Sequence, residues 1–269
     1  MTNIPHATST YQSAHSRARI VVVLLIVGAV VSLLTIPVGV FEISLPELTP
    51  NQDFSDNPAG AAVLLLSGLF GLITIVIYIA TAVTFLMWLY RSGNNLPAFG
   101  VGKRQIGYSP GWAVGSFFVP FVNLVVPYRA VREVWQKSEP PSTVSFSYAV
   151  SPPGFFPAWW GFWIASNIAN NAHFRMTMAD APRDVTAMVG IVGEVLSIVA
   201  AVFAIMVVRE IDRRQDESSK HLPASQGWPA PPPPPVFHPD TNLQRASSAP
   251  STEKSAPATT PDASRNLSS

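Results

Sequence analysis

Glu194 is the residue whose type and setting point most directly to chemistry. It is the one charged residue in an apolar block that runs from 185 to 208. A charged side chain at the centre of a bilayer costs at least about 2.5–3.5 kcal/mol, and acids kept there often serve proton relays or cation sites. The structural alternative is an uncharged or hydrogen-bonded side chain that holds helices together, because burial favours the neutral form of an acid. Both interpretations stay open, since the sequence shows no chain of partners for a relay.

Amide side chains could complete an intramembrane polar site around this acid. Asn167, Asn170 and Asn171 lie at one end of an earlier apolar block, and the i, i+4 spacing of Asn167 and Asn171 places these two on one face of a helix. The candidate intramembrane site that we select comprises Glu194, Asn123, Asn167 and Asn171. The alternative role of such amides is to join helices, at about 0.6 kcal/mol per hydrogen bond.

A second group of candidate residues belongs to an amphipathic helix predicted at 128–137. Its basic side chains, Arg129, Arg132 and Lys137, could bind anionic lipid headgroups, and each nearby cation contributes about 1 kcal/mol. Trp135 suits the membrane surface because an amphipathic ring favours the headgroup level. An acidic residue interrupts the basic set, so simple anchoring of the helix at the interface is the default interpretation.

The patterns of known catalytic sites are missing from the sequence. It holds no HExxH, GxSxG or Walker motif and no cysteine. Its five histidines are scattered, so we expect no metal site, no cofactor and no catalytic residue. A net charge of +1 gives no electrostatic basis for binding nucleic acid. An enzyme that acts on lipid is therefore the weakest functional hypothesis.

Four apolar blocks must position the candidate residues. Hydrophobic residues make up 48% of the chain and charged residues 12%, whereas soluble domains carry about 25% charged residues. About 20 apolar residues cross a hydrocarbon core of roughly 30 Å, so each block suits one helical crossing. The first block is too long for a signal peptide, whose apolar region has about 7–15 residues. The four blocks are 20–41, 61–90, 154–172 and 185–208.

A fifth apolar stretch, 110–128, contains Pro120 and Pro127, which each remove a backbone donor from a helix. Lysine and arginine concentrate on the cytoplasmic side of membranes, so their positions test whether this stretch crosses. If it does not cross, the inside holds twelve cations near the spans and the outside holds two. If it crosses, each side holds seven. The sequence therefore predicts an all-α integral membrane protein with four transmembrane helices, one re-entrant or interfacial broken helix, and both termini in the cytoplasm.

Three regions follow from these elements. Residues 1–17 form a short polar N-terminus, 18–212 the four-span membrane domain, and 213–269 a tail rich in Pro, Ser and Ala that we predict to be disordered. Five consecutive prolines at 231–235 could engage a proline-binding protein or act as a spacer. Nothing in the sequence indicates an oligomeric state.

Three long motifs lie between 88 and 170: WLYRSGNNLPAFG, SPGWAVGSFFVPFVNLVVPYRAVREVW and PAWWGFWIASNIAN. Their distinctive residues are Trp88 with Arg91 and Asn94 or Asn95, Ser109 to Trp112, Pro120 with Asn123, Pro127 with Tyr128, and Glu133 with Trp135. With these motifs, the region from about 20 to 212 resembles the bacterial membrane proteins grouped as domain of unknown function 4328. The resemblance implies a multi-span domain in a bacterial membrane. It brings no activity, substrate or catalytic residue.

The sequence leads to two main functional hypotheses for a multi-pass protein of the bacterial plasma membrane. The one we favour at this point is a non-enzymatic scaffold or accessory protein that recruits protein partners through its tail. The alternative is a small transporter or channel subunit that uses Glu194 and the broken 110–128 segment.

Overall fold

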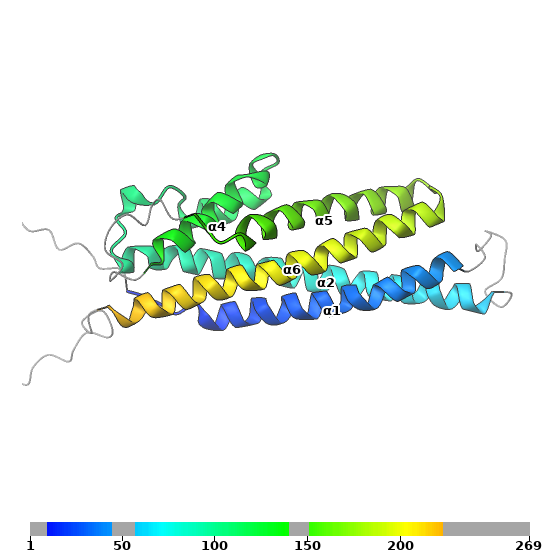
Figure 1. Ribbon diagram of the computed structural model, residues 1–269, viewed down its shortest axis with the longest axis horizontal. Helices are drawn as coiled ribbons and strands as arrows, with labels where there is room; N and C mark the ends of the chain where they lie inside the picture. Colours follow the sequence, from blue (N-terminus) through cyan, green and yellow to red (C-terminus); the bar gives the residue numbers. More distant parts are fainter. Residues whose placement is uncertain (1–9, 45–56, 140–150, 223–269) are drawn as a thin grey trace, which may run out of the picture. The chain divides into compact units, whose positions relative to one another are not determined.

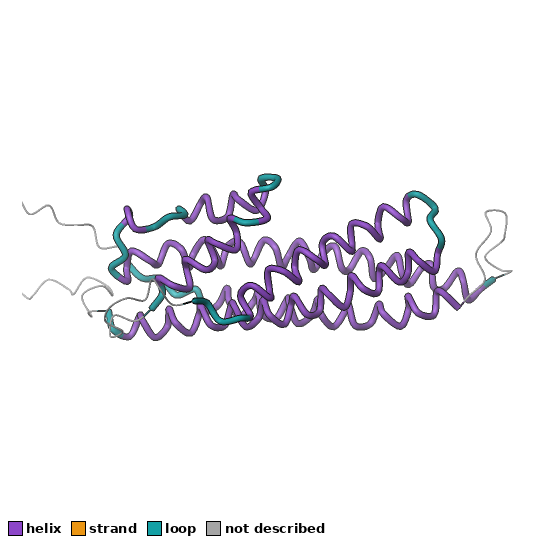
Figure 2. The backbone as a smooth tube through the Cα atoms, turned by 45° about the horizontal axis from the view of Figure 1, so that its top comes forward, coloured by secondary structure: helices purple, strands orange, loops and turns teal. Residues whose placement is uncertain are grey.

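Every regular element in the part of the chain that the structure describes is a helix. The computed structural model describes residues 10–44, 57–139 and 151–222 (Figure 1). The long helices are α1 (His15–Ser44), α2 (Pro58–Asn95), α5 (Phe155–Met178) and α6 (Arg183–Lys220). Figure 2 shows helices joined by short loops over these ranges. The all-α prediction is confirmed.

Three of the long helices, α1, α2 and α6, are long and apolar enough to cross a membrane. Large apolar side chains are exposed along them; on α2, for example, Leu65 is 74% exposed and Val76 is 67% exposed. A helix that is apolar all round is typical of a membrane span. α5 has 24 residues but is less apolar, because amides, His173 and Arg175 occupy its second half. Length and composition therefore identify three candidate spans among the described helices.

α2 is longer than the apolar block that predicted it. It begins after Asn57, whose Oδ1 accepts a hydrogen bond of 2.9 Å from the Gly60 N–H, and Pro58 takes the first helical position. It ends at Asn95, beyond the predicted end at Tyr90. Its 38 residues make a helix of about 57 Å, so its ends extend beyond a hydrocarbon core of roughly 30 Å.

α6 also extends further than predicted, through Lys220. It passes the boundary at 213 where the sequence analysis placed the start of the tail, so residues 213–220 are helical. Ion pairs one helical turn apart support this last part of the helix. Arg213 pairs with Glu217 at 2.7 Å, and Lys220 pairs with Asp216 at 2.7 Å. The remaining residues of the predicted tail, 223–269, lie outside the described ranges.

The long helices form a row in the order α5, α6, α1, α2. α6 packs along both α5 and α1, and α1 packs along α2. The outer helices, α2 and α5, meet through the Phe85 and Trp159 rings, whose centroids are 5.9 Å apart. Elsewhere their backbones lie further apart than those of the packed pairs. In Figure 1 the start of α1 and the ends of α2 and α6 lie at one end of the bundle, and the α5–α6 turn lies at the other.

The buried core lies toward the end of the bundle where α2 and α6 finish. Its fully buried side chains come from several helices and include Trp88, Leu89, Val131, Phe156 and Ile211. Aromatic side chains supply much of the buried area, and such residues bury about 150–250 Å² each. This packed end holds the helices together, while α2 exposes most of its apolar side chains further along.

The chain between α2 and α5 is divided into short pieces. Two 3₁₀ turns, η1 (Leu96–Phe99) and η2 (Lys103–Gln105), follow α2. Next come α3 (Pro110–Gly115), η3 (Ser116–Phe118), η4 (Val122–Leu124) and α4 (Val126–Lys137). We call residues 110–128 the broken segment. Figure 1 shows it running part of the way along the bundle and returning with α4.

The break in this segment falls where its prolines predict it. Pro120 lies between η3 and η4, where the helical backbone stops. Phe121 follows with φ of 64°, in the left-handed region that bulky residues rarely adopt. The amphipathic helix predicted at 128–137 is confirmed as α4.

Candidate functional site

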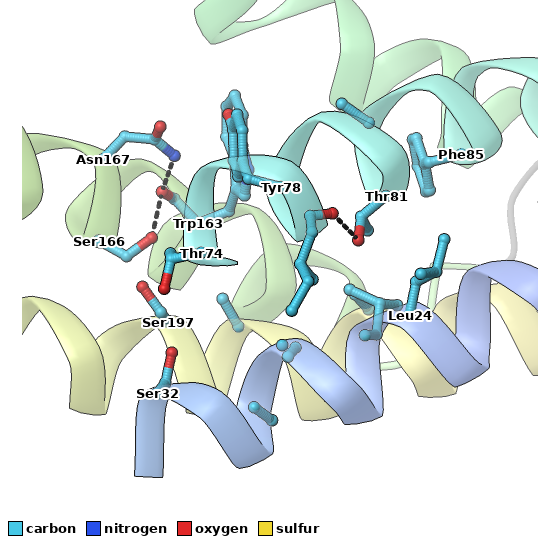
Figure 3. A pocket seen from close by; sticks show the side chains of 18 of the residues that line it. Leu24, Ser32, Thr74, Tyr78, Thr81, Phe85, Trp163, Ser166, Asn167 and Ser197 are labelled. Atoms are coloured by element: carbon cyan, nitrogen blue, oxygen red, sulfur yellow. Dashed lines mark hydrogen bonds between the residues drawn. The ribbon is translucent and has the colours of Figure 1, made fainter. Parts of the chain in front are cut away.

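A cavity of about 500 Å³ lies between the four long helices. Its walls are mostly apolar and include Leu24, Leu25, Ile77, Phe85 and Trp163. Three residues of the broken segment also line it: Phe117, Phe118 and Asn123. Figure 3 shows side chains of α1, α2, α5 and α6 around this space.

One wall of the cavity is polar, where α5 faces α6. Asn170 Nδ2 donates a hydrogen bond of 3.3 Å to Ser197 Oγ, which donates to the Gly193 carbonyl at 2.9 Å. One turn earlier on α5, Asn167 Nδ2 donates to the Trp163 carbonyl at 2.7 Å (Figure 3). These bonds within the protein orient the amides and the hydroxyl.

Glu194 lies on the same wall, one helical turn before Ser197 on α6. Among the described residues, no hydrogen bond or ion pair reaches its carboxyl group. It is also the one Asp, Glu, Lys or Arg among the residues that line this cavity. Because a charged group removed from water is costly unless it is paired, this acid is suited to receive a cation or a hydrogen-bond donor.

The close contact between α5 and α6 depends on two glycines. A Cβ at Gly193 would overlap the side-chain oxygen of Asn170, and a Cβ at Gly190 would lie 2.9 Å from His173 Nδ1. His173 Nδ1 also lies 2.9 Å from the Thr186 carbonyl oxygen. The absent side chains therefore let α5 approach closely enough for Asn170 to reach α6.

Buried polar side chains join three helices where α2, α4 and α6 finish. Gln215 Nε2 donates to the Ser92 carbonyl at 2.9 Å and to Ser138 Oγ at 3.0 Å, and Gln215 Oε1 accepts from Asn95 Nδ2 at 3.0 Å. Asn95 also exchanges two hydrogen bonds, of 3.0 and 3.2 Å, with the backbone of Gln12. We call Gln12, Ser92, Asn95, Ser138 and Gln215 the Gln215 cluster. It fixes α2, α4, α6 and the segment before α1 relative to one another.

Side chains of α4 and α5 hold the loop before the broken segment and the segment itself. On α4, the Glu133 carboxylate accepts hydrogen bonds from the N–H groups of Gly107 at 2.6 Å and Tyr108 at 3.0 Å. On α5, Trp160 Nε1 donates to the Leu124 carbonyl at 2.8 Å. These bonds satisfy backbone groups that an irregular segment leaves unpaired.

Comparison with known protein families identifies the family of this chain. The family described as "Domain of unknown function (DUF4328)" matches residues 54–213, more than half of the 269 residues. The chain belongs to the DUF4328 family. No curated protein and no solved structure shows significant similarity to it. The resemblance inferred from the sequence motifs is confirmed.

The DUF4328 match contains α2, the broken segment, α5 and most of α6, and thus most of the cavity wall. The motif residues serve mainly to hold this part together. Trp88 and Trp135 are buried in the core, while Asn95 and Glu133 make the hydrogen bonds described above. α1 precedes the matched range and supplies one wall of the cavity.

The cavity of this DUF4328 protein brings together three of the four residues selected for an intramembrane site: Glu194, Asn123 and Asn167. Asn171 does not line the cavity; it is exposed and its Oδ1 accepts a hydrogen bond of 2.8 Å from Arg175 Nε. Asn170 takes its place. The i, i+3 spacing from Asn167 to Asn170 could have identified it, since positions three apart also share a helix face.

The residues selected to bind lipid headgroups differ in how exposed they are. Trp135 is 2% exposed and packs in the core, with the Arg214 guanidinium 4.0 Å from its ring centroid. Its predicted place at the headgroup level stays a prediction. Lys137 forms an ion pair with Glu133 and is largely buried. The other two basic residues of this set are the exposed Arg129 and the half-buried Arg132.

Several charged groups beyond the apolar part of α6 are paired with one another. Glu210 accepts hydrogen bonds from Arg213 at 2.9 and 3.1 Å and from Arg214 at 2.9 Å. Burial raises the pKa of the Glu210 carboxyl, but these hydrogen bonds outweigh it and hold the pKa below its ordinary value. In the described part of the chain, no three His, Cys, Asp or Glu residues gather as a metal site would require.

Proposed function

We propose that this DUF4328 protein is a four-span membrane protein that binds an amphipathic small molecule inside the bilayer. The cavity between the four long helices carries the proposal. Small-molecule sites typically have about 300–1,000 Å³, with apolar walls and a few placed polar groups. The cavity of about 500 Å³ has this character, with Glu194, Asn167 and Asn170 on one wall.

α5 is the fourth span in this proposal. Its 24 residues make about 36 Å of helix, enough for a hydrocarbon core of roughly 30 Å. It packs along α6, to which a short turn joins it, and α6 is apolar enough to span. Placing α5 beside α6 directs Asn167 and Asn170 into the cavity, which explains how a span tolerates its amides.

The positions of the cations support an orientation with both termini in the cytoplasm. Arg175 and Arg183 lie near the α5–α6 turn. The other cations of the membrane domain lie toward the opposite end of the helices: Arg17, Arg19, Arg91, Lys103, Arg104, Arg129, Arg132, Lys137, Arg209, Arg213, Arg214 and Lys220. An excess of Lys and Arg marks the cytoplasmic side. With the resemblance to bacterial proteins, this distribution supports the bacterial plasma membrane as the proposed location.

Glu194 lies near the middle of the membrane in this arrangement. α6 begins at Arg183, and a rise of 1.5 Å per residue puts Glu194 about 16 Å from that end. That is about half of a hydrocarbon core of roughly 30 Å. The polar wall is therefore at a depth where water is scarce and a ligand's polar group needs a protein partner.

The broken segment enters the membrane from the cytoplasmic side and returns. Phe118 is 74% exposed and Phe121 is 86% exposed at its turn, as suits side chains that contact lipid. Irregular backbone at membrane depth is tolerated where protein covers it, and the Trp160 hydrogen bond to Leu124 supplies part of that cover. Asn123 lines the cavity from this side.

The experiment fills the cavity without changing the lipid surface. Ala201 lines the cavity, and the adjacent Val202 on α6 is 51% exposed. We would reconstitute wild type, Ala201→Trp and Val202→Trp in nanodiscs and count bound dodecanol or dodecylamine by native mass spectrometry. Wild type and Val202→Trp should each bind one equivalent of at least one probe, and Ala201→Trp should bind none. Equal binding by both variants would overturn the proposal.

Of the two functions predicted from the sequence, transport would use this cavity and the scaffold function would not. A transporter would use the same site, so the transporter alternative extends the binding proposal and needs flux in liposomes to support it. A scaffold that recruits partners would use residues 223–269, which lie outside the described ranges. The scaffold function stays a prediction, with its test given in the Discussion.

A further inference from the structure

The cavity has a preference for one kind of polar group, because its polar wall is rich in acceptors. Ser166 Oγ donates to the Trp163 carbonyl at 2.9 Å, and Ser197 Oγ donates to Gly193. Thus both hydroxyl protons on the α5 and α6 side are already used. Each amide nitrogen, on Asn167 and Asn170, also donates one hydrogen bond within the protein.

The acceptors on the same wall are not used in this way. The carboxyl group of Glu194 accepts no hydrogen bond within the described ranges, and the same holds for the side-chain oxygens of Asn167 and Asn170. Each amide nitrogen keeps a second N–H, so the unpaired carboxyl group of Glu194 is the acceptor that requires a ligand with a hydrogen-bond donor. Since Glu194 is the one ionisable acid or base of the cavity apart from Tyr78, a donor that is also positively charged fits best.

The opposite walls are suited to a hydrocarbon chain. α1 and α2 contribute Leu24, Leu25, Ile77 and Phe85, and α5 contributes the ring of Trp163. Aromatic rings next to the polar wall also attract cations. The cavity as a whole therefore matches a molecule with a cationic group at one end and an apolar body.

The cavity reaches the lipid-facing surface between α2 and α5. Tyr78 on α2 lines the cavity and is 55% exposed, and Asn167 on α5 lines the cavity and is exposed. Figure 3 shows Tyr78 near Trp163, on the same side of the cavity as Asn167. α2 and α5 are the outer helices of the row and do not pack along their length. A ligand dissolved in the bilayer can thus enter sideways, without passing through water.

We propose that the ligand is a cationic amphiphile, an alkylamine in its protonated form, which enters from the bilayer between Tyr78 and Asn167 and pairs its ammonium group with Glu194. This inference rests on the proposed function and adds the chemical class of the ligand. The ammonium donates to the Glu194 carboxylate, while the alkyl chain lies along α1 and α2.

The test compares probes that share one chain length and differ in their head. Dodecylamine, dodecanol and dodecanoate would be added to the full-length protein in nanodiscs of one zwitterionic lipid, with binding measured by native mass spectrometry at pH 7. Wild type should bind dodecylamine at least about tenfold more tightly than dodecanol, since a charge-assisted hydrogen bond at a dry site exceeds a neutral one by about 1.4 kcal/mol or more. Dodecanoate should not bind.

Variants then assign the preference to one side chain. Glu194→Gln keeps the size of the side chain and should reduce dodecylamine affinity by about tenfold or more, with a clearly smaller change in dodecanol affinity. The matched control is Asp184→Asn, which removes an exposed acid in the first turn of the same helix and should change neither affinity. Equal dodecylamine binding by wild type and Glu194→Gln would overturn the inference.

The outcomes separate this inference from the proposed function. If dodecanol and dodecylamine bind equally and Ala201→Trp abolishes both, the cavity binds amphiphiles but the preference for a cation is wrong. If no probe binds to wild type and Ala201→Trp changes nothing, the proposed function itself is wrong. Preferential binding of dodecanoate would also overturn the assignment of Glu194 as the partner of the ligand head.

Discussion

The side-chain oxygen of Gln215 accepts a hydrogen bond of 3.0 Å from Asn95 Nδ2, although 120 positions separate the two residues in the sequence. Both are buried, with Gln215 1% exposed and Asn95 2% exposed. A buried polar group that loses its partner costs about 1–3 kcal/mol. This contact therefore makes the end of α6 a part of the membrane domain.

Gln215→Leu should lower the free energy of unfolding by about 2–4 kcal/mol, because it leaves the Ser92 carbonyl, Ser138 Oγ and Asn95 Nδ2 each short of a hydrogen bond. The measurement is unfolding in mixed micelles with increasing dodecyl sulfate. Glu217→Gln is the matched control, two residues further along α6. It breaks a solvent-exposed ion pair with Arg213 and should cost less than about 1 kcal/mol. Similar losses in both variants would contradict the role given to the Gln215 cluster.

Truncation distinguishes the helical end of α6 from the rest of the predicted tail. Removal of 223–269 should leave the unfolding transition unchanged, because α6 and the Gln215 cluster end before residue 223. Removal of 215–269 should destabilise the protein by at least as much as Gln215→Leu, since it also deletes the Ser218 hydrogen bond of 2.9 Å to the Ser138 carbonyl.

The shorter truncation also tests the scaffold prediction. If the tail recruits protein partners, the chain that ends at 222 should stay folded and lose those partners in a crosslinking experiment in cells. Full retention of partners by the folded, truncated chain would remove the tail as the recruiting element.

Gly193→Ala should push α5 away from α6, because its Cβ would overlap the Asn170 side chain. We expect a loss of about 1–3 kcal/mol in the free energy of unfolding, as for other overpacked positions. Gly161→Ala is the control on α5, where a Cβ would meet nothing within 4 Å. That substitution should be neutral or stabilise the helix by up to about 1 kcal/mol. A neutral result for Gly193→Ala would show that the helices can separate at no cost.

The pH dependence of stability should contain a contribution from Glu210. Its pKa lies below the ordinary value of 4.5 because hydrogen bonds from Arg213 and Arg214 outweigh the effect of burial. An acid whose pKa is lowered by folding stabilises the folded state above its unfolded pKa, and this stabilisation is lost as the pH falls through the folded pKa. The melting temperature of wild type should therefore decrease as the pH is lowered below about 4.5. In Glu210→Gln this part of the decrease in stability at low pH should be absent. If the variant and wild type show the same dependence of melting temperature on pH, Glu210 makes no such contribution.

Cysteine labelling should decide the orientation, since the chain has no cysteine of its own. Ala179→Cys lies in the α5–α6 turn, and Lys103→Cys lies in η2 near the end of α2; both positions are exposed. In intact cells, a membrane-impermeant maleimide should label the cysteine at 179 at once. The cysteine at 103 should react only after the membrane is permeabilised. Labelling of position 103 from outside would refute the proposed orientation. Protection of both positions in intact cells would refute the re-entrant path of the broken segment, because a crossing there would put position 179 inside as well.

Several features of the fold could be predicted because they depend on local chemistry. The apolar stretches around 20–41, 61–90 and 185–208 have the length of a crossing helix, and helices cover them. A proline inside a helix removes a backbone donor whatever packs around it. The break near Phe121 could therefore be predicted from Pro120 without knowing which helices pack against the segment. The extra length of α6 was missed because residues 213–220 are polar, and their helix depends on ion pairs and on Gln215.

What the sequence by itself determined is the set of apolar helices, the broken segment and the presence of one acid in the last apolar block. Only the tertiary structure decided that Asn170, rather than Asn171, shares the cavity wall with Glu194. Adjacent residues on a helix point about 100° apart, so the rotation of α5 against α6 selects one of the two amides. Close packing at Gly193 sets that rotation, and packing between distant segments leaves no local pattern in the sequence.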